Sequence, residues 1–164
     1  MNERPTVRGL MDAAPYSISE DESLLMAWEV MERSGQQQLP VVRGDGCCAG
    51  LLERAELAVV CAAAATALSR RKVRELVHAR RTVTAHPEEP ALRAAAVMTA
   101  ERLDALPVTD RHGRLVGLLT ARDYVAAAAG LRSHAEPTGR GPARATLPGL
   151  PPHRATREHG IPIP

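Results

Sequence analysis

Residues 117–123 read Gly-Leu-Leu-Thr-Ala-Arg-Asp and join an apolar segment of strand length to a helix through a polar turn. Thr120 stands where a helix N-cap belongs, and Asp123 follows it at the spacing of a capping box. The alanine-rich helix that begins here is expected to end at Gly130. A helix N-terminus carries partial positive charge and Arg122 adds a cation beside it. The stretch therefore predicts either a phosphate-binding turn or a simple helix cap.

A second copy of this pattern lies earlier in the chain. Residues 24–57 align with residues 91–124 at a constant shift of 67, without a gap, so that Leu-Pro-Val and Gly-Leu-Leu both occur twice. Further upstream the best shift is 65, where residues 17–19 meet residues 82–84. An internal repeat of this kind predicts two copies of one supersecondary unit.

Each copy predicts the same order of elements. A short strand, around Ile18 or Val83, precedes a helix with apolar residues at helical spacing. A Leu-Pro-Val strand, a turn ending in glycine and a Gly-Leu-Leu strand then form a hairpin, and a closing helix follows. The predicted fold class is therefore α+β, with the unit β-α-β-β-α occurring twice. The apolar helix positions are Leu24, Ala27, Trp28 and Met31 in the first copy and Ala91, Ala94, Ala95 and Met98 in the second.

These residues resemble tandem cystathionine-β-synthase (CBS) domains, the paired regulatory units called Bateman modules. The resemblance rests on the Leu-Pro-Val strand, the glycine turn and the Gly-hydrophobic-hydrophobic-Thr/Ser-x-x-Asp signature, all present in residues 106–123. It covers about residues 7–130. It implies two CBS repeats, residues 7–66 and 67–130, packed about a pseudo-twofold axis with sheets inside, helices outside and two clefts between them.

The resemblance also implies a function. Members of this family bind adenosyl compounds such as AMP, ADP, ATP, NAD or S-adenosylmethionine, so we expect a ligand-sensing regulatory module with its site in the second repeat. The implied contacts are the backbone of Thr82 and Val83 for the adenine edge, Ala105, Leu106 and Pro107 for the base, Thr120 and Arg122 for phosphate, and Asp123 for the ribose hydroxyls.

The first repeat departs from the signature. Glu53 stands in place of the Thr or Ser, and Glu56 in place of the Asp. Two carboxylates suit the bare helix dipole but repel a phosphate, and Arg54 offsets only part of this repulsion. We therefore expect one nucleotide per chain, in the cleft beside Thr120.

Composition excludes several other classes. The chain has 164 residues, 45% of them hydrophobic and 2% aromatic, without any Phe, so its core must be built from Leu, Val, Ala and Met. The N-terminus lacks the apolar stretch of a signal peptide. The longest apolar run, residues 57–67, is shorter than the ~20 residues that span a bilayer. Unpaired cysteines at positions 47, 48 and 61 fit reduced thiols, so the expected compartment is the cytoplasm.

No catalytic chemistry is indicated. The sequence has no G-x-S-x-G elbow and no Walker loop, and its histidines show no H-E-x-x-H spacing. The adjacent Cys47 and Cys48 do not give the C-x₂-C spacing of a zinc site. We therefore expect neither an enzyme nor a metal site, and no cofactor other than the regulatory ligand.

Two basic segments remain. The run at residues 69–74 reads as a solvated helical linker. Residues 131–164 hold seven of the 13 prolines, and their five Arg and two Glu give a net charge of +3, which predicts a disordered tail with at most a weak nucleic-acid role.

Alternatives to the ligand-sensing function stay open. The chain could be a degenerate pair that serves only for dimerisation or docking, or a regulator whose tail contacts nucleic acid. The alanine-rich closing helices (Ala62 to Ala67 and Ala126 to Ala129) permit close approach, so a homodimer is expected. The regulated target would be an effector protein outside this chain.

Overall fold

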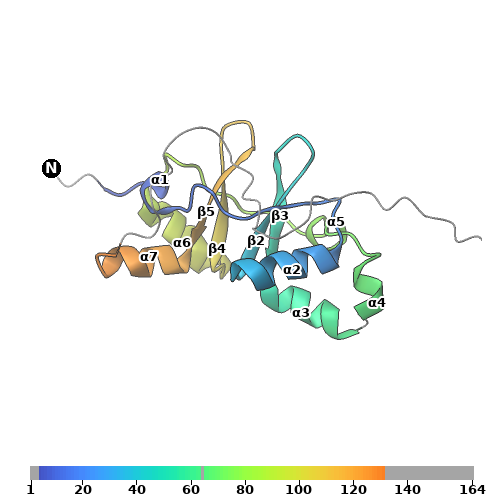
Figure 1. The fold of residues 1–164 in the computed structure, drawn as a ribbon. Helices are drawn as coiled ribbons and strands as arrows, with labels where there is room; N and C mark the ends of the chain where they lie inside the picture. Colours follow the sequence, from blue (N-terminus) through green and yellow to red (C-terminus); the bar gives the residue numbers. More distant parts are fainter. Residues whose placement is uncertain (1–3, 64, 132–164) are drawn as a thin grey trace, which may run out of the picture.

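The computed structural model describes residues 4–63 and 65–131 (Figure 1). The predicted tail, residues 131–164, lies outside the described residues except for Leu131, and so does residue 64 of the first closing helix. No helix in these described ranges is both long and apolar enough to cross a membrane. The order of helices and strands matches the predicted unit, apart from the strand expected around Val83 and two additional short helices at residues 7–10 and 74–77. The α+β class is confirmed.

The first repeat forms a three-stranded sheet in which β2 lies between β1, parallel to it, and β3, antiparallel to it. Helix α2 begins after Ser23, whose hydroxyl accepts a hydrogen bond from the Met26 N–H at 3.1 Å. It ends at Gly35, which has the left-handed φ of 72°. The elements are β1 (Ile18–Ser19), α2 (Leu24–Ser34), β2 (Gln38–Val42), β3 (Cys48–Glu53), α3 (Arg54–Ala63) and α4 (Ala65–Leu68).

The second repeat forms an antiparallel hairpin flanked by two helices. Helix α7 starts at the predicted cap and ends where expected, because Gly130 takes a φ of 70° and the Leu131 N–H donates to the Ala126 carbonyl at 2.8 Å. The elements are α5 (Arg74–Val77), α6 (Ala91–Glu101), β4 (Ala105–Thr109), β5 (Leu115–Thr120) and α7 (Ala121–Ala128).

The strand expected around Val83 is reduced to one parallel bridge between Ala85 and Val108. In the first repeat Ile18 pairs with Val41. The structural shift at these strands is therefore 67, and the shift of 65 read from the sequence was wrong.

A proline explains why this pairing ends so early. In the first repeat the Glu20 N–H donates to the Val42 carbonyl at 2.9 Å and extends the strand pair. Pro87 occupies the equivalent position in the second repeat and has no N–H to donate.

The segment that precedes each repeat packs on the other repeat. Val7 begins α1 (Val7–Leu10), and its N–H donates to the Glu89 carbonyl at 2.9 Å; the Val73 N–H donates to the Glu22 carbonyl at the same distance. Figure 1 accordingly shows α1 near α6 and α7, and α5 at the other end of the molecule, near β3. We call these two exchanged segments, residues 5–13 and 71–78, the leaders.

The basic run at residues 69–74 leads into the second leader, which contains residues 71–74 of the run, and it is not the expected helical linker. Lys72 forms a β-bridge with Ser23, and the Arg71 carbonyl accepts a hydrogen bond from the Leu24 N–H at 3.0 Å. Val73 is fully buried. The run is held by the first repeat, because its backbone caps the start of α2.

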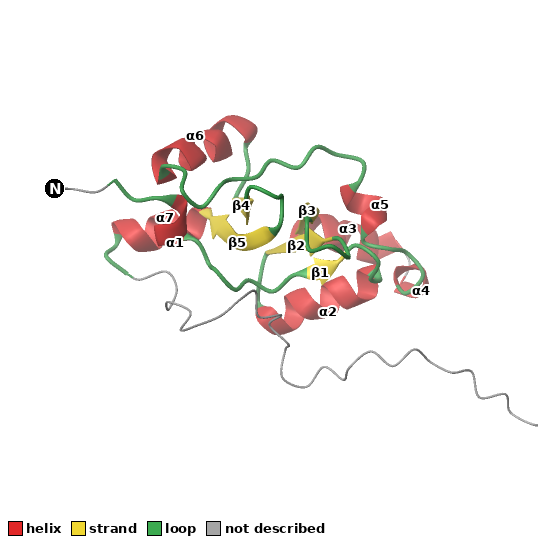
Figure 2. Ribbon diagram, turned by 90° about the horizontal axis from the view of Figure 1, so that it is seen from above, coloured by secondary structure: helices red, strands yellow, loops and turns green. Residues whose placement is uncertain are grey.

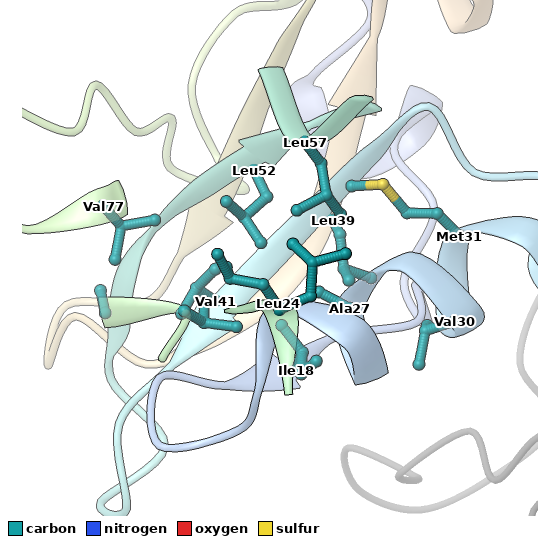
Figure 3. Close-up of a cluster of buried hydrophobic side chains, with 13 residues drawn as sticks. Ile18, Leu24, Ala27, Val30, Met31, Leu39, Val41, Leu52, Leu57 and Val77 are labelled. Carbon is teal, nitrogen blue, oxygen red and sulfur yellow. The ribbon is translucent and has the colours of Figure 1, made fainter. Parts of the chain in front are cut away.

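Each repeat has its own hydrophobic core, and each core includes residues of the other repeat's leader. Figure 3 shows the first core, where Val77 of α5 meets strands β2 and β3 and helix α2. The second core contains Val7 and Met11 from the N-terminal leader. As composition required, the buried hydrophobic side chains are those of Leu, Val, Ile, Ala and Met. The packing units thus cross the boundary between the sequence repeats.

The two hairpins meet at a pseudo-twofold axis. The Cys48 N–H donates to the Gly113 carbonyl at 2.9 Å, and the Leu115 N–H donates to the Gly46 carbonyl at 3.2 Å, each pair being the other shifted by 67. Figure 2, seen from above, shows the strands of both sheets at the centre with helices at either end. This arrangement places β3 next to β4 and β2 next to β5.

The glycine of each Gly-Leu-Leu strand is required by its leader. A Cβ added at Gly117 would lie 2.7 Å from Met11 Sδ and 2.8 Å from the Asp12 carbonyl oxygen. At Gly50 it would lie 2.8 Å from Val77 Cβ. Both distances are shorter than real Cβ contacts, so the leaders pack directly on the bare backbone of these strands.

Replacing Gly117 by alanine tests this packing. We expect Gly117→Ala to lower the free energy of unfolding by about 1 to 3 kcal/mol, because the Asp12 carbonyl must move to make room. Gly44→Ala is the matched control, since no atom lies within 4 Å of its added Cβ. Chemical denaturation of both variants measures the difference, and equal stabilities would contradict the close approach.

Candidate functional site

The structure brings some of the predicted site residues together in a small cavity between the end of β3 and the start of β4. The cavity measures ≈ 90 Å³. Its lining contains residues of both repeats: Leu51, Glu53, Arg80, Arg81, Thr82, Val83, Leu103, Ala105 and Pro107. We call it the open cleft.

The other predicted residues lie elsewhere. Thr120, Arg122 and Asp123 are not among the residues that line the open cleft. Leu106 is buried in the core of the second repeat, because successive side chains of a strand point to opposite faces. The phosphate and ribose contacts expected for one nucleotide are therefore separated from the expected adenine contacts.

The backbone of Val83 is the polar feature of the open cleft. Within the described residues, neither its N–H nor its C=O makes a hydrogen bond. Beside it, the Thr82 hydroxyl donates to the Ala49 carbonyl at 3.3 Å, which ties this segment to β3. Ala105 and Pro107 supply an apolar wall. A flat ring with a hydrogen-bond donor next to an acceptor could pair with the C=O and N–H of Val83 and pack on this apolar wall.

Arg80 lines the open cleft and is bonded to both β3 and α3. Its guanidinium donates to the Leu51 carbonyl at 2.8 Å and to the Glu56 carboxylate at 2.7 Å. The charge of Glu56, expected to repel phosphate, is thus matched by a cation. Arg54, expected to offset part of the charge of Glu53, pairs with Glu32 and lies over the Trp28 ring at 5.1 Å.

The Thr120-x-x-Asp123 motif forms a capping box at the start of α7. The Asp123 carboxylate accepts hydrogen bonds from the Thr120 N–H at 2.7 Å and from the Thr120 hydroxyl at 2.9 Å. Asp123 is only 4% exposed, whereas Arg122 is exposed. In this structure the motif closes a helix end.

The pseudo-twofold axis assigns Thr120 to the opposite cleft. Shifting the lining of the open cleft by 67 gives a counterpart between β2 and the end of β5, which are neighbours in the fold. We call this counterpart the closed cleft. Its equivalent residues are Ala13, Ala14, Pro15, Tyr16, Gln36, Gln38, Pro40, Leu118 and Thr120, so the two arginines of the open cleft are replaced by alanines.

A larger cavity of ≈ 530 Å³ lies between the N-terminal leader and the two hairpin turns. Arg43 and Arg114 line it together with Asp110. Hydrogen bonds from the Arg114 and His112 backbone N–H groups hold the pKa of the Asp110 carboxyl below its ordinary value. The sequence had not indicated this cavity, because its lining comes from loops without a motif.

The cysteines are free thiols. Cys47, Cys48 and Cys61 form no disulfide, and burial raises the pKa of the Cys48 and Cys61 thiols. Among the described residues, no group of three or more His, Cys, Asp and Glu side chains is placed to hold a metal ion.

Comparison with known proteins establishes the family. The CBS domain model matches residues 7–62 and 73–130, so the chain belongs to the CBS domain family and carries two copies of the domain. The chain is also 32% identical over 118 residues to homoserine O-acetyltransferase of Methanococcoides burtonii, a match that covers 72% of this chain and 23% of that enzyme. The chain thus spans about a quarter of the length of the curated relatives it matches first.

Solved structures share the fold. A CBS domain pair in complex with 5′-methylthioadenosine and S-adenosyl-L-methionine superimposes with a TM-score of 0.68 at 23% identity, covering 78% of this chain and 98% of that one. A second protein, solved in complex with AMP, gives a TM-score of 0.67 at 21% identity over 76% of this chain and 96% of that one.

The cap at α7 gives a direct test. We expect Asp123→Ala to lower the free energy of unfolding by about 1 kcal/mol, because the Thr120 N–H loses its acceptor. Arg122→Ala, on the exposed side of the same turn, should change stability by less than about 0.5 kcal/mol. Thermal and chemical denaturation without ligand measure both. An Asp123→Ala protein with the stability of the unchanged chain would show that the capping box does not stabilise α7.

Proposed function

We propose that this CBS pair is a regulatory module that binds an adenosyl compound (AMP, ADP, ATP or S-adenosylmethionine) in the open cleft of the second repeat. The observation that carries the proposal is the unpaired backbone of Val83 inside a cavity with apolar walls. Similar folds solved with adenosyl ligands support the ligand class. We propose binding rather than catalysis, because the described residues that line this cavity form no known catalytic arrangement.

In this proposal the adenine ring would occupy the open cleft beside the Val83 backbone. Its amino group would donate to the Val83 carbonyl while a neighbouring ring nitrogen accepts from the Val83 N–H. Leu103, Ala105 and Pro107 would pack on the faces of the ring. At ≈ 90 Å³ the cavity is smaller than the ~300 Å³ or more of whole-ligand pockets, so the ribose and phosphate extend toward Arg80.

Charges at the mouth suit the outer parts of the ligand. The Glu53 carboxylate would accept hydrogen bonds from the ribose hydroxyls, a role in which acidic side chains serve other nucleotide sites. Arg80 would exchange the Glu56 carboxylate for a phosphate, and Arg81 lies beside it. The roles predicted for Thr120, Arg122 and Asp123 would belong to the closed cleft.

A panel of ligands tests the function. We expect AMP, ADP, ATP or S-adenosylmethionine to raise the melting temperature, since a ligand at 100 times its Kd stabilises the fold by about 2.7 kcal/mol. GTP is the control, because guanine presents an acceptor at position 6 where adenine has an amino donor. Absence of any shift with adenosyl compounds would favour a degenerate pair that serves only for docking.

The phosphate contact has its own variant. We expect Arg80→Ala to weaken ATP binding at least tenfold and adenosine binding much less, because only ATP carries charges for the lost guanidinium. Arg93→Ala is the matched control, because Arg93 is an exposed residue of α6 that pairs with the half-buried Glu89, away from the open cleft. Calorimetry at two salt concentrations measures both. An equal loss of affinity for ATP and for adenosine would show that Arg80 does not bind the phosphates.

We also propose a homodimer that regulates an effector protein. Val59 on α3 and Val125 on α7 are 74% and 69% exposed, so the closing helices present unburied apolar groups. Residue 64 of the alanine run lies outside the described residues. Light scattering should give the dimer mass, and Val125→Glu should shift it toward the monomer. A monomer mass at tens of micromolar for the unchanged chain would exclude this association.

The compartment that best fits these features is the cytoplasm. Cys47, Cys48 and Cys61 are all free thiols, and such cysteines persist where the surroundings are reducing. This placement agrees with the ligand class, because adenine nucleotides signal the metabolic state inside cells.

A further inference from the structure

The two clefts differ at one pair of equivalent residues. Gly35 and Arg102 both take a left-handed backbone conformation, with φ of 72° and 55°, and so end α2 and α6 in the same way. The next residue is Gln36 in the first repeat and Leu103 in the second. Leu103 lines the open cleft, so its equivalent Gln36 lies at the closed cleft.

The side-chain amide of Gln36 makes three hydrogen bonds to backbone groups at the closed cleft. Its amide oxygen accepts from the Tyr16 N–H at 2.8 Å. Its amide nitrogen donates to the Tyr16 carbonyl at 3.1 Å and to the Gln38 carbonyl at 2.9 Å. Tyr16 is the residue equivalent to Val83, so the backbone pair that is open in one cleft is fully bonded in the other.

The amide of Gln36 has the same hydrogen-bonding pattern as the edge of adenine. A primary amide places one acceptor beside one donor, and adenine places a ring nitrogen beside its amino group in the same way. Both can bond simultaneously to the N–H and C=O of one extended residue. The side chain of Leu103 has no polar atom, so it leaves the Val83 N–H and C=O for a ligand.

The rest of the closed cleft retains the elements that suit a nucleotide. Thr120 stands at the start of α7 beside the exposed Arg122, whereas the open cleft has Glu53 at the position of Thr120. The repulsion between a phosphate and Glu53 would by itself favour binding in the closed cleft, which has Thr120 at that position. The hydrogen bonds of Gln36 oppose it, because a ligand can enter only after all three are broken.

We propose that the closed cleft is a second adenine site that the side chain of Gln36 occupies, so that the residue after α2 or α6 decides which cleft takes the base. The inference rests on the proposed adenosyl function. It predicts that substitutions of Gln36 and Leu103 change the number of nucleotides bound per chain, without any substitution in the turn at Thr120.

Exchange of the two residues is the experiment. With the full chain and AMP or ATP in calorimetry, we expect one site per chain for the unchanged protein and two for Gln36→Leu. Leu103→Gln should lose the open site, weakening binding at least tenfold. The double exchange Gln36→Leu with Leu103→Gln should again bind one nucleotide per chain, now sensitive to Arg122→Ala and insensitive to Arg80→Ala.

Gln37→Leu is the matched control. The exposed side chain of this neighbouring glutamine donates to the Gly35 carbonyl at 3.3 Å and makes no other hydrogen bond within the described part of the chain, so its loss should leave one site. If Gln36→Leu lowers stability too far, Leu103→Gln carries the test alone, because it introduces the amide into an existing site and leaves the first repeat intact.

The outcomes separate the two proposals. No binding to the unchanged chain or to any variant would overturn the adenosyl function itself. If folded Gln36→Leu still binds one nucleotide per chain, as the unchanged protein does, the role of Gln36 would be overturned. The same holds if Leu103→Gln binds at full affinity. The hydrogen bonds of Gln36 to Tyr16 would then be purely structural. Two equal sites in the unchanged chain would also overturn it.

Discussion

The exchange of leaders between the two repeats is the constraint on which the rest of the structure depends. Val7 and Met11 complete the second core, and Val73 and Val77 complete the first. Because each leader lies against a bare glycine backbone, at Gly50 or Gly117, the strands must carry glycine there. The leaders also lead into residues 14–17 and 79–84, and thus position the backbone that faces each cleft. The packing of the cores and the position of the backbone at the clefts are therefore set by the same segments.

Much of the fold was predictable from local patterns. The constant shift of 67 predicted two hairpins with the same register, and the structure pairs Leu106 with Leu119 and Leu39 with Leu52. The cap at Thr120 and the end at Gly130 were predicted because they depend on neighbouring residues only. The shortened strand near Ala85 was also readable in principle, since Pro87 cannot donate a hydrogen bond.

The site was less predictable, because it depends on contacts between distant segments. The sequence does not show that a Gly-Leu-Leu strand faces the Leu-Pro-Val strand of the other repeat. The predicted adenine contacts at Val83 and the predicted phosphate contacts at Thr120 were consequently joined into one site, although the structure separates them. Gln36 carried no signal either. It lies in a run of three glutamines that reads as an ordinary polar loop, and only its bonds to Tyr16 distinguish it.

The mutual bonds between the hairpins, from Cys48 to Gly113 and from Leu115 to Gly46, have a consequence for the origin of the fold. A polypeptide with only one such unit could satisfy every one of these bonds, and receive its missing leader, by associating with an identical copy. The present chain has the geometry of such a two-chain assembly joined by duplication of its coding sequence. In an assembly of identical copies both clefts must be the same. Covalent joining removes that requirement, so one half can diverge while the other keeps its chemistry.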